Sequence, residues 1–392
     1  MNIPGNVKKI LSELNARGFE AYAVGGCVRD TLLGREPEDW DITTNALPKE
    51  IKSIFRRTVD TGIEHGTVTV MEGKTGYEIT TYRLDGNYTD GRHPDHVAFT
   101  PSLREDLKRR DFTINAMACS GQEDLVDLFG GQKDLSEKIV RAVGNPDERF
   151  TEDALRILRA VRFSAQLGFT LEPKTKNALK DHAPNLVHVS KERIFTELNK
   201  ILLSDHPEEG MQILESGMGG YIAEHFSEIV LSRKIAELPK EKYFRWAAAF
   251  PDSSPEDLKS VLKTLKSDNE TAEISVLLLK EMKKDLPENK TSVRFFLSKI
   301  GPDRLDDLLV LAKAGFGKTT ALAEISETER MKEEVMKAGD CYELKTLALT
   351  GTDLAEAGIE PGPEIGKTLR KLLKEVCEHP EFNTKQKLLS ML

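Results

Sequence analysis

The sequence predicts an α+β fold in which a mixed β-sheet occupies the first part of the chain and helices form the rest. Up to about residue 145, short apolar runs that end in glycine-rich turns alternate with amphipathic segments, a pattern typical of strands and helices mixed in one domain. After Phe150 the apolar residues recur with helical spacing, and strand patterns nearly vanish. A chain of 392 residues is long enough for roughly two to three domains.

The elements of the first part follow from local signals. The pattern predicts a helix over 6–17, a strand over 20–24, a helix over 27–33, a strand over 39–43 and a helix over 48–55. Segments 66–72 and 77–83 predict a hairpin, because glycines separate them. The polar segment 84–99 predicts a mobile loop, and Ser102 with Glu105 predicts a capped helix that runs through Arg110.

Composition restricts the class of protein. Hydrophobic residues make up 39% of the chain, no apolar run approaches the ~18 residues of a membrane span, and the N-terminus lacks an apolar signal segment. The four cysteines lie far apart, which favours a reduced cytoplasmic protein without disulfides or structural zinc. The net charge of −9 disfavours nonspecific coating of nucleic acid, but an RNA partner could still bind one local basic face.

The first candidate site is a glycine turn. Gly25 and Gly26 join the predicted strand over 20–24 to a helix, and such a turn lets backbone N–H groups approach an anion at the helix N-terminus. Arg29 follows one turn later and can donate two hydrogen bonds to phosphate oxygens. Taken alone, the two glycines are equally typical of a plain strand-to-helix turn.

The second candidate site is a pair of carboxylates. Asp39 and Asp41 are two residues apart, so in a strand both side chains lie on one face. Magnesium prefers oxygen ligands, and two-metal sites catalyse in-line phosphoryl chemistry. Glu78, in the neighbouring predicted strand, could supply a third carboxylate. A polar edge strand is the alternative, and the glycine turn just before the pair favours the catalytic interpretation.

Two arginine-rich segments complete the pattern. Arg110 could bind a phosphate or ribose, and Asp111 could contact a ribose hydroxyl or support the metals; a solvated helix end is the alternative. Further on, Asp153 precedes arginines at every third position, which form a curved basic stripe on a helix: Arg156, Arg159 and Arg162. An Asp–Arg pair one turn apart could accept CTP and ATP and reject UTP and GTP. The acids alone could instead be ordinary helix caps.

These segments together resemble the bacterial class II tRNA nucleotidyltransferases, the CCA-adding enzymes. The motifs are GGCVRD, EDWDITT, LKRRDFTINAM and TEDALRILRAVRF, and the likeness covers essentially the whole chain. The resemblance implies a polymerase β-like head over 1–145, followed by a helical neck over 146–205, a body over 206–285 and a tail over 286–392. It also implies that segment 84–99 is the flexible loop associated with the change from C to A addition.

The resemblance also implies roles for individual residues. Asp39 and Asp41 would bind Mg²⁺, Gly26 and Arg29 would hold the triphosphate, and Arg110 would contact the nucleotide. Asp153 and Arg156 would read the base, while Arg159 and Arg162 would line the same pocket.

A tail helix offers a check that does not depend on the family. Over 364–377, four apolar residues share one helical face and four cations share the other: Lys367, Arg370, Lys371 and Lys374. The cations could hold phosphates of the tRNA elbow, as the family's tail would. A solvated helix face is the alternative for any one of them.

The predicted function is template-independent addition of CCA to the 3′ end of tRNA, with CTP and ATP as substrates and Mg²⁺ as cofactor. The alternatives are a half-enzyme that adds only CC or only A, a poly(A) polymerase, and a non-catalytic tRNA-binding protein. The sequence contains no membrane segment. It allows a homodimer but does not demand one.

Overall fold

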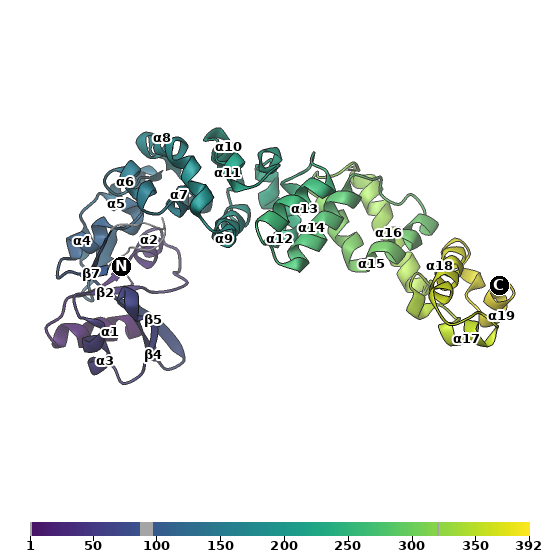
Figure 1. Ribbon diagram of the computed structural model, residues 1–392, viewed down its shortest axis with the longest axis horizontal. Coiled ribbons are helices and arrows are strands. Elements are labelled where there is room, and N and C mark those ends of the chain that lie inside the picture. Colours follow the sequence, from purple (N-terminus) through teal and green to yellow (C-terminus); the bar gives the residue numbers. More distant parts are fainter. Residues whose placement is uncertain (1, 87–96, 320) are drawn as a thin grey trace. The chain divides into compact units, whose positions relative to one another are not determined.

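The computed structural model describes residues 2–86, 97–319 and 321–392 (Figure 1). The chain divides into two compact units. The first unit comprises Met1–Ser227 together with Lys263–Ser267, and the second comprises Glu228–Leu262 together with Asp268–Leu392. The first unit contains the sheet, and the second is helical.

A seven-stranded sheet forms the core of the first unit, in the order β3-β4-β5-β2-β1-β8-β9. The strands are β1 (Ala21–Val24), β2 (Ile42–Thr44), β3 (Thr58–Gly62), β4 (Thr67–Glu72), β5 (Thr75–Thr81), β8 (Met117–Cys119) and β9 (Leu125–Asp127). Only the β2–β5 pair is parallel among these neighbours, so the sheet is mixed, as predicted. The predicted hairpin is confirmed as β4 and β5, which turn at Gly73-Lys74.

Helices and short 3₁₀ turns surround this sheet: α1 (Gly5–Ala16), α2 (Gly26–Leu32), α3 (Pro48–Ile54), η1 (Ile63–His65), α4 (Leu103–Lys108), η2 (Thr113–Asn115) and α5 (Gly131–Glu137). Helix α1 buries one apolar face, and Ser102 caps α4 by accepting a hydrogen bond from the Glu105 N–H at 3.4 Å. The predicted helices α1, α2 and α3 are confirmed within a residue or two.

Three predictions about the head need correction. The strand after the two aspartates begins at Ile42 rather than at residue 39. Segment 84–99 is not a loop throughout, because β6 (Arg83–Asp85) pairs with β7 (Val97–Phe99), while residues 87–96 lie outside the described residues. The helix that begins after Ser102 ends at Lys108, before Arg110.

The first unit continues with helices that follow the sheet: α6 (Pro146–Glu152), α7 (Leu155–Leu167), α8 (Pro173–His182), η3 (Ala183–His188), α9 (Lys191–Leu202), η4 (Pro207–Met211), α10 (Gln212–Glu215) and α11 (Gly219–Ile222). Helix α7 packs against α9 and is buried along most of its length. Two short strands, β10 (Ile139–Val140) and β11 (Thr170–Leu171), pair in parallel.

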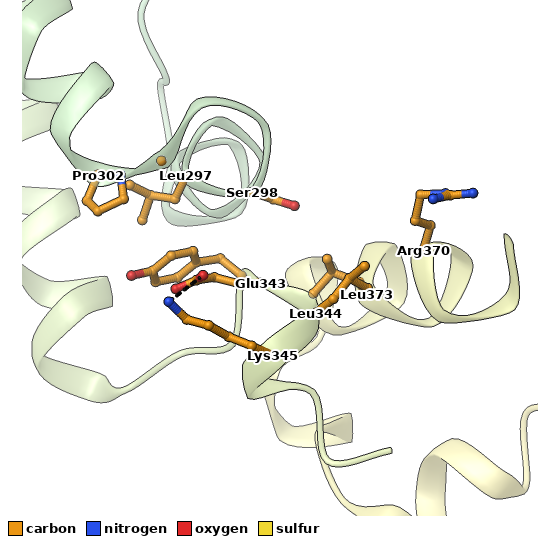
Figure 2. Close-up of a pocket in the computed structure, with 10 residues that line it drawn as sticks. Leu297, Ser298, Pro302, Glu343, Leu344, Lys345, Arg370 and Leu373 are labelled. Carbon is orange, nitrogen blue, oxygen red and sulfur yellow. Dashed lines mark ion pairs between the residues drawn. The ribbon is translucent and has the colours of Figure 1, made fainter. Parts of the chain in front are cut away.

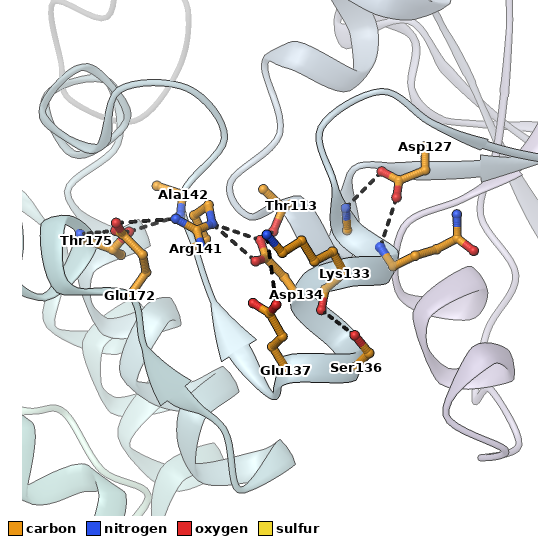
Figure 3. A network of polar contacts seen from close by, with 12 residues as sticks. Thr113, Asp127, Lys133, Asp134, Ser136, Glu137, Arg141, Ala142, Glu172 and Thr175 are labelled. Carbon is orange, nitrogen blue, oxygen red and sulfur yellow. Dashed lines mark hydrogen bonds and ion pairs between the residues drawn. The ribbon is translucent and has the colours of Figure 1, made fainter.

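A polar network joins the end of the sheet region to these helices (Figure 3). Asp134 of α5 is buried, accepts a hydrogen bond from Thr113 at 2.6 Å and pairs with Arg141 at 3.0 Å. Arg141 also pairs with Glu172 at 3.3 Å, and Glu172 caps α8 by accepting from the Thr175 N–H at 2.7 Å. The network therefore ties η2 to α8 through buried and half-buried charges.

The second unit is built from α12 (Lys242–Ala248), α14 (Asn269–Met282), α15 (Lys290–Lys313), α16 (Leu322–Ala338), α17 (Gly351–Glu356), α18 (Pro363–Glu378) and α19 (Lys385–Leu389), with η6 (Arg233–Glu237), η7 (Leu344–Thr346) and η8 (Pro380–Phe382). Helix α13 (Pro255–Thr264) and η5 (Phe226–Glu228) span the boundaries of the two units. One apolar cluster lies between α15 and α16, and another gathers around α17 and α18. None of the described helices combines the length and the apolar composition that a bilayer crossing requires.

Candidate active site

Three carboxylates lie close together where the chain enters β2 beside β5. Asp39 and Asp41 lie directly before β2, and the parallel register of Ile42 with Ile79 brings Asp41 beside Glu78 of β5. All three side chains keep contact with solvent. The pKa of Asp41 is nevertheless raised to about 6: loss of hydration is the main cause, followed by the charge of Asp39, while Glu78 adds to the rise and Arg110 opposes it. The site therefore concentrates negative charge at a position that a ligand can reach.

The glycine turn makes room for an arginine. Gly25 has a φ of 83°, and a Cβ atom there would lie 3.0 Å from the Arg110 guanidinium. A side chain at this position would therefore be strained, and the Arg110 guanidinium would have to shift by a few tenths of an ångström. We expected the glycines to let the backbone approach an anion, and the structure adds this second reason for Gly25. The Nε atom of Arg110 is buried without a hydrogen-bond partner among the described residues.

Asp106 holds the arginines beside this turn. Its side chain is fully buried and pairs with Arg109 at 2.8 Å and with Arg110 at 3.5 Å. The same carboxylate accepts a hydrogen bond from Thr43 of β2 at 3.1 Å. The positive neighbours outweigh burial and lower the pKa of Asp106. Asp106 thus connects the strand that follows the aspartates to Arg110.

Arg29 is positioned by two groups. Its guanidinium donates twice to Asp30, at 2.8 Å each, and once to the Asn115 side chain at 2.7 Å. A planar guanidinium carries five N–H donors, so donors remain for a phosphate. Asn115 belongs to η2, which the network of Figure 3 secures.

The predicted base-reading residues lie where two helices meet. Asp153 ends α6 and accepts a hydrogen bond from the Leu155 N–H at 3.0 Å at the start of α7, so the helix breaks here instead of running on. The Asp153 carboxylate pairs with Arg193 of α9 at 3.1 Å. Arg156 pairs with Glu152 at 2.7 Å and donates to the Arg109 carbonyl at 3.1 Å. Asp153 therefore caps the start of α7, as the alternative interpretation of the acids proposed, and it also forms an ion pair.

The other two arginines of α7 do not form an open basic stripe. Arg159 pairs with Asp111, and this contact holds the pKa of the buried Asp111 carboxyl well below its usual range despite burial. Arg162 is 7% exposed and pairs with the buried Glu197 of α9 at 3.3 Å. Asp111 is therefore an anchor for Arg159.

Several residues that hold this site together were not predicted from the sequence. The ring of Phe163 has three guanidinium groups within 5.6 Å of its centroid, those of Arg29, Arg159 and Arg162. Arg193 and Glu197 were missed because their partners, Asp153 and Arg162, are distant in sequence and leave no local pattern. Asp106 was missed although Arg109 and Arg110 are only three and four residues away, because its segment is rich in charged residues and gives no sign that this carboxylate is buried.

The tail helix has the two faces that were predicted. In α18 Leu372 and Val376 are buried, and the four cations are exposed. Lys367 pairs with Glu364 at 2.6 Å, whereas Arg370, Lys371 and Lys374 form no ion pair with any described residue. Three unpaired cations therefore line one face of α18.

Comparisons with known proteins give the family. Three family models match: the poly A polymerase head domain over 21–141, the probable RNA and SrmB-binding site of polymerase A over 168–218, and the putative tRNA nucleotidyltransferase domain 2 over 241–392. The CCA-adding enzyme of Lacticaseibacillus paracasei is 40% identical over 391 residues, which cover 97% of this chain and 94% of that protein. That of Levilactobacillus brevis is 40% identical over 394 residues, which cover 98% and 96%.

A solved structure agrees with these relatives. The crystal structure of the Bacillus stearothermophilus CCA-adding enzyme in complex with CTP is similar with a TM-score of 0.83 at 30% identity, and the match covers 100% of this chain and 97% of that one. The sheet and the helices that follow it thus have the polymerase β-like nucleotidyltransferase architecture that the sequence predicted. The chain belongs to the CCA-adding enzymes, which are tRNA nucleotidyltransferases.

Proposed function

We propose that this chain adds the nucleotides C, C and A to the 3′ end of tRNA, taking them from CTP and ATP and releasing pyrophosphate. The observation that carries the proposal is the 40% identity with CCA-adding enzymes along nearly the whole chain. The site supports it, because three carboxylates lie beside Arg110 and the glycine turn. Acidic metal ligands and phosphate-binding arginines are the groups that nucleotidyl transfer requires.

Asp39 and Asp41 would hold Mg²⁺, with Glu78 as a third carboxylate. The donor set fits, since Mg²⁺ prefers carboxylate oxygens and a divalent cation would offset the loss of hydration and the charge of Asp39, which raise the pKa of Asp41. When bound, the metal would activate the 3′-hydroxyl of the tRNA and hold the triphosphate. Arg29 and Arg110 would bind the phosphate oxygens, with Gly25 and Gly26 giving the phosphates close access to the backbone.

Asp153 and Arg156 would choose the nucleotide in place of a template. Cytosine and adenine both present an amino donor beside a ring-nitrogen acceptor, which a carboxylate and a guanidinium match. Uracil and guanine present the reverse order, so their binding would leave polar groups unpaired. The ion pairs with Arg193 and Glu152 support this role, because they restrict the two side chains to defined orientations. Asp111, Arg159 and Arg162 would complete the nucleotide pocket behind them.

Successive parts of the chain would have different roles. Residues 1–145 would form the catalytic head, 146–205 the neck that reads the base, 206–285 the body and 286–392 the tail that binds tRNA. The unpaired cations of α18 support the role of the tail, because phosphate oxygens are natural partners for exposed arginine and lysine. Lys367 would contribute less than its neighbours, since Glu364 neutralises it.

The test supplies a tRNA that lacks its last three nucleotides with Mg²⁺ and each nucleoside triphosphate, and resolves the products at single-nucleotide length. We expect two additions with CTP alone, a third when ATP is also present, and none with UTP or GTP. A product that stops at CC with both nucleotides, or A addition only to tRNA that already ends in CC, would identify a half-enzyme. A long A tract would identify a poly(A) polymerase, and no addition would favour a binding protein.

A further inference from the structure

A pocket of about 480 Å³ opens in the second unit between α15, η7 and α18 (Figure 2). Leu297 and Pro302 of α15 line one side, and Leu344 and Leu373 lie on the other. Tyr342 adds an aromatic ring to the lining. Small-molecule sites have volumes of this order and combine apolar walls with a few polar groups.

The wall from α15 exists because the helix is broken there. Gly301 has a φ of 80° and interrupts the helical backbone, and Pro302 follows it. Proline has no N–H, so the carbonyl of Ser298, four residues earlier, has no helical donor in that position. Gly301 and Pro302 at the break and the exposed Ser298 just before it all line the pocket.

The two sides of the pocket are firmly joined. Arg294 of α15 is 6% exposed, donates to the carbonyl of Cys377 in α18 at 2.6 Å and pairs with Asp340 at 2.9 Å. Phe295 packs against the apolar cluster that contains Leu373. A buried guanidinium that links α15 to α18 and to the segment before η7 makes the pocket a preformed feature.

Charge at the edge of the pocket indicates its ligand. Arg370 lines the pocket, and Lys371 and Lys374 continue along the same helix; none of these cations pairs with an acid in the described part of the chain. Glu343 and Lys345 pair with each other at 2.8 Å beside the opening. An aromatic ring stacks on nucleobases, and an unpaired arginine binds phosphate. The Arg370 side chain points away from the pocket in Figure 2, so an RNA strand meets both groups with a base inside the pocket and a phosphate outside it.

We propose that this pocket receives one unpaired nucleotide of the bound RNA, with its base against Tyr342, while Arg370 binds a phosphate of the same strand outside the pocket. A free nucleotide has the same chemistry, but Lys371 and Lys374 would then have no phosphates to bind, whereas an RNA strand supplies them. The nucleotide must be unpaired, because a base within an RNA duplex cannot leave its stack without cost. The inference rests on the proposed function only in taking the RNA to be tRNA.

The test combines tRNA binding with nucleotide-resolution chemical footprinting of unpaired bases. Ser298→Phe fills the pocket from an exposed position, and Tyr342→Ala removes the ring. Tyr221→Ala, at a tyrosine that is 37% exposed in the first unit, is the matched control for Tyr342→Ala. Circular dichroism and melting curves establish that each variant is folded, and Ser298→Phe keeps the test valid if Tyr342→Ala does not fold.

We expect both pocket variants to raise the Kd for tRNA about tenfold, because one stacked base contributes that order of affinity. The KM for tRNA should rise while kcat and the KM for CTP stay unchanged. One unpaired nucleotide should be protected by the wild type and exposed with Ser298→Phe. Kd values and footprints equal to those of the wild type in both variants would overturn the inference. Binding of AMP or CMP that Ser298→Phe abolishes, while neither variant changes the Kd for tRNA, would also overturn it, because the pocket would then hold a free nucleotide. Binding and footprints need no catalysis, so a wild type that binds in this way but adds no nucleotide would refute only the proposed function.

Discussion

The carboxylate of Asp153 pairs with the guanidinium of Arg193 at 3.1 Å, and Arg193 comes from α9, forty residues further along the chain. Arg156 pairs separately with Glu152 at 2.7 Å. The two side chains proposed to read the base are therefore oriented by different partners. A selective site needs such fixed orientations, because discrimination between bases depends on where donors and acceptors lie.

Arg193→Ala should weaken base selection. Without its partner, Asp153 would lose its orientation, so we expect kcat/KM for CTP and ATP to fall about 10- to 100-fold and incorporation of UTP and GTP to rise relative to them. Single-nucleotide kinetics with all four triphosphates would measure this. Lys200→Ala, at an exposed position of the same helix, is the control. An unchanged ratio of CTP to UTP incorporation in Arg193→Ala would show that the ion pair does not serve selection.

Asp41→Asn should stabilise the metal-free protein. The pKa of Asp41 is 3.8 ordinarily and about 6 in the folded chain. Between these values the folded state binds more protons than the unfolded state, so stability falls as the pH rises and stays lower above about 6. At about pH 7 the substitution should raise the free energy of unfolding by ~1 kcal/mol. This is less than the pKa shift alone implies, because the side chain contacts solvent.

Melting curves with and without Mg²⁺ would test whether Asp41→Asn stabilises the metal-free protein. We expect Mg²⁺ to raise the Tm of the wild type, because a ligand that binds only the folded state stabilises it, and to leave Asp41→Asn unchanged. A variant that melts below the wild type without Mg²⁺ would contradict the inference that loss of hydration and the charge of Asp39 make ionised Asp41 unfavourable in the folded protein. An Mg²⁺ response equal to that of the wild type would contradict the metal-binding role of Asp41.

Asp106→Asn should weaken triphosphate binding. The substitution removes the charge that holds Arg109 and Arg110, so we expect the KM for CTP and ATP to rise about tenfold with a smaller effect on the KM for tRNA. Thr43→Val is the control, since it removes the 3.1 Å hydrogen bond to the same carboxylate and a 3.2 Å bond to the Thr80 carbonyl but leaves the charge of Asp106 in place. If both variants change the KM for CTP equally, Asp106 acts through the strand and not through Arg110.

Glu197→Gln should destabilise the first unit. Glu197 is 4% exposed and balances Arg162, which burial would otherwise leave as an isolated charge; the pKa of Arg162 is already lowered to about 10, mainly by burial. Breaking a buried pair costs about 3 kcal/mol, whereas an exposed pair contributes under about 1 kcal/mol. Urea unfolding of Glu197→Gln and of Glu215→Gln, which breaks the exposed pair with Lys176 at 3.0 Å, compares the two cases. Equal losses would contradict this account.

Local patterns predicted the elements that local forces determine. Helix α1 follows from its apolar face, the β4–β5 hairpin from its turn at Gly73, and the start of α4 from the cap at Ser102. Strands β3, β8 and β9 were missed, because short strands are defined by partners distant in sequence and carry little pattern of their own. Helix α6 was also missed, whereas the capping alternative at Asp153 indicated a helix start close to that of α7.

The site could be predicted as a set of residues but not as a set of contacts. The sequence indicated that Asp39, Asp41 and Glu78 could share one face, and the β2–β5 register places Asp41 beside Glu78. It gave no indication that Arg159 and Arg162 would each bind an acid, Asp111 in one case and Glu197 in the other. Such pairs depend on tertiary packing, which a linear motif does not encode.

The central claim is that the two aspartates carry the chemistry of CCA addition, and single-turnover extension by Asp39→Asn and Asp41→Asn tests it most directly. The assay uses tRNA without its last three nucleotides, saturating CTP and ATP and Mg²⁺, and tRNA binding is measured in parallel. The account predicts that each variant binds tRNA as the wild type does and extends it at least about 1000-fold more slowly, a loss of about 4 kcal/mol of transition-state stabilisation. Extension by either variant at a rate close to that of the wild type would contradict the account.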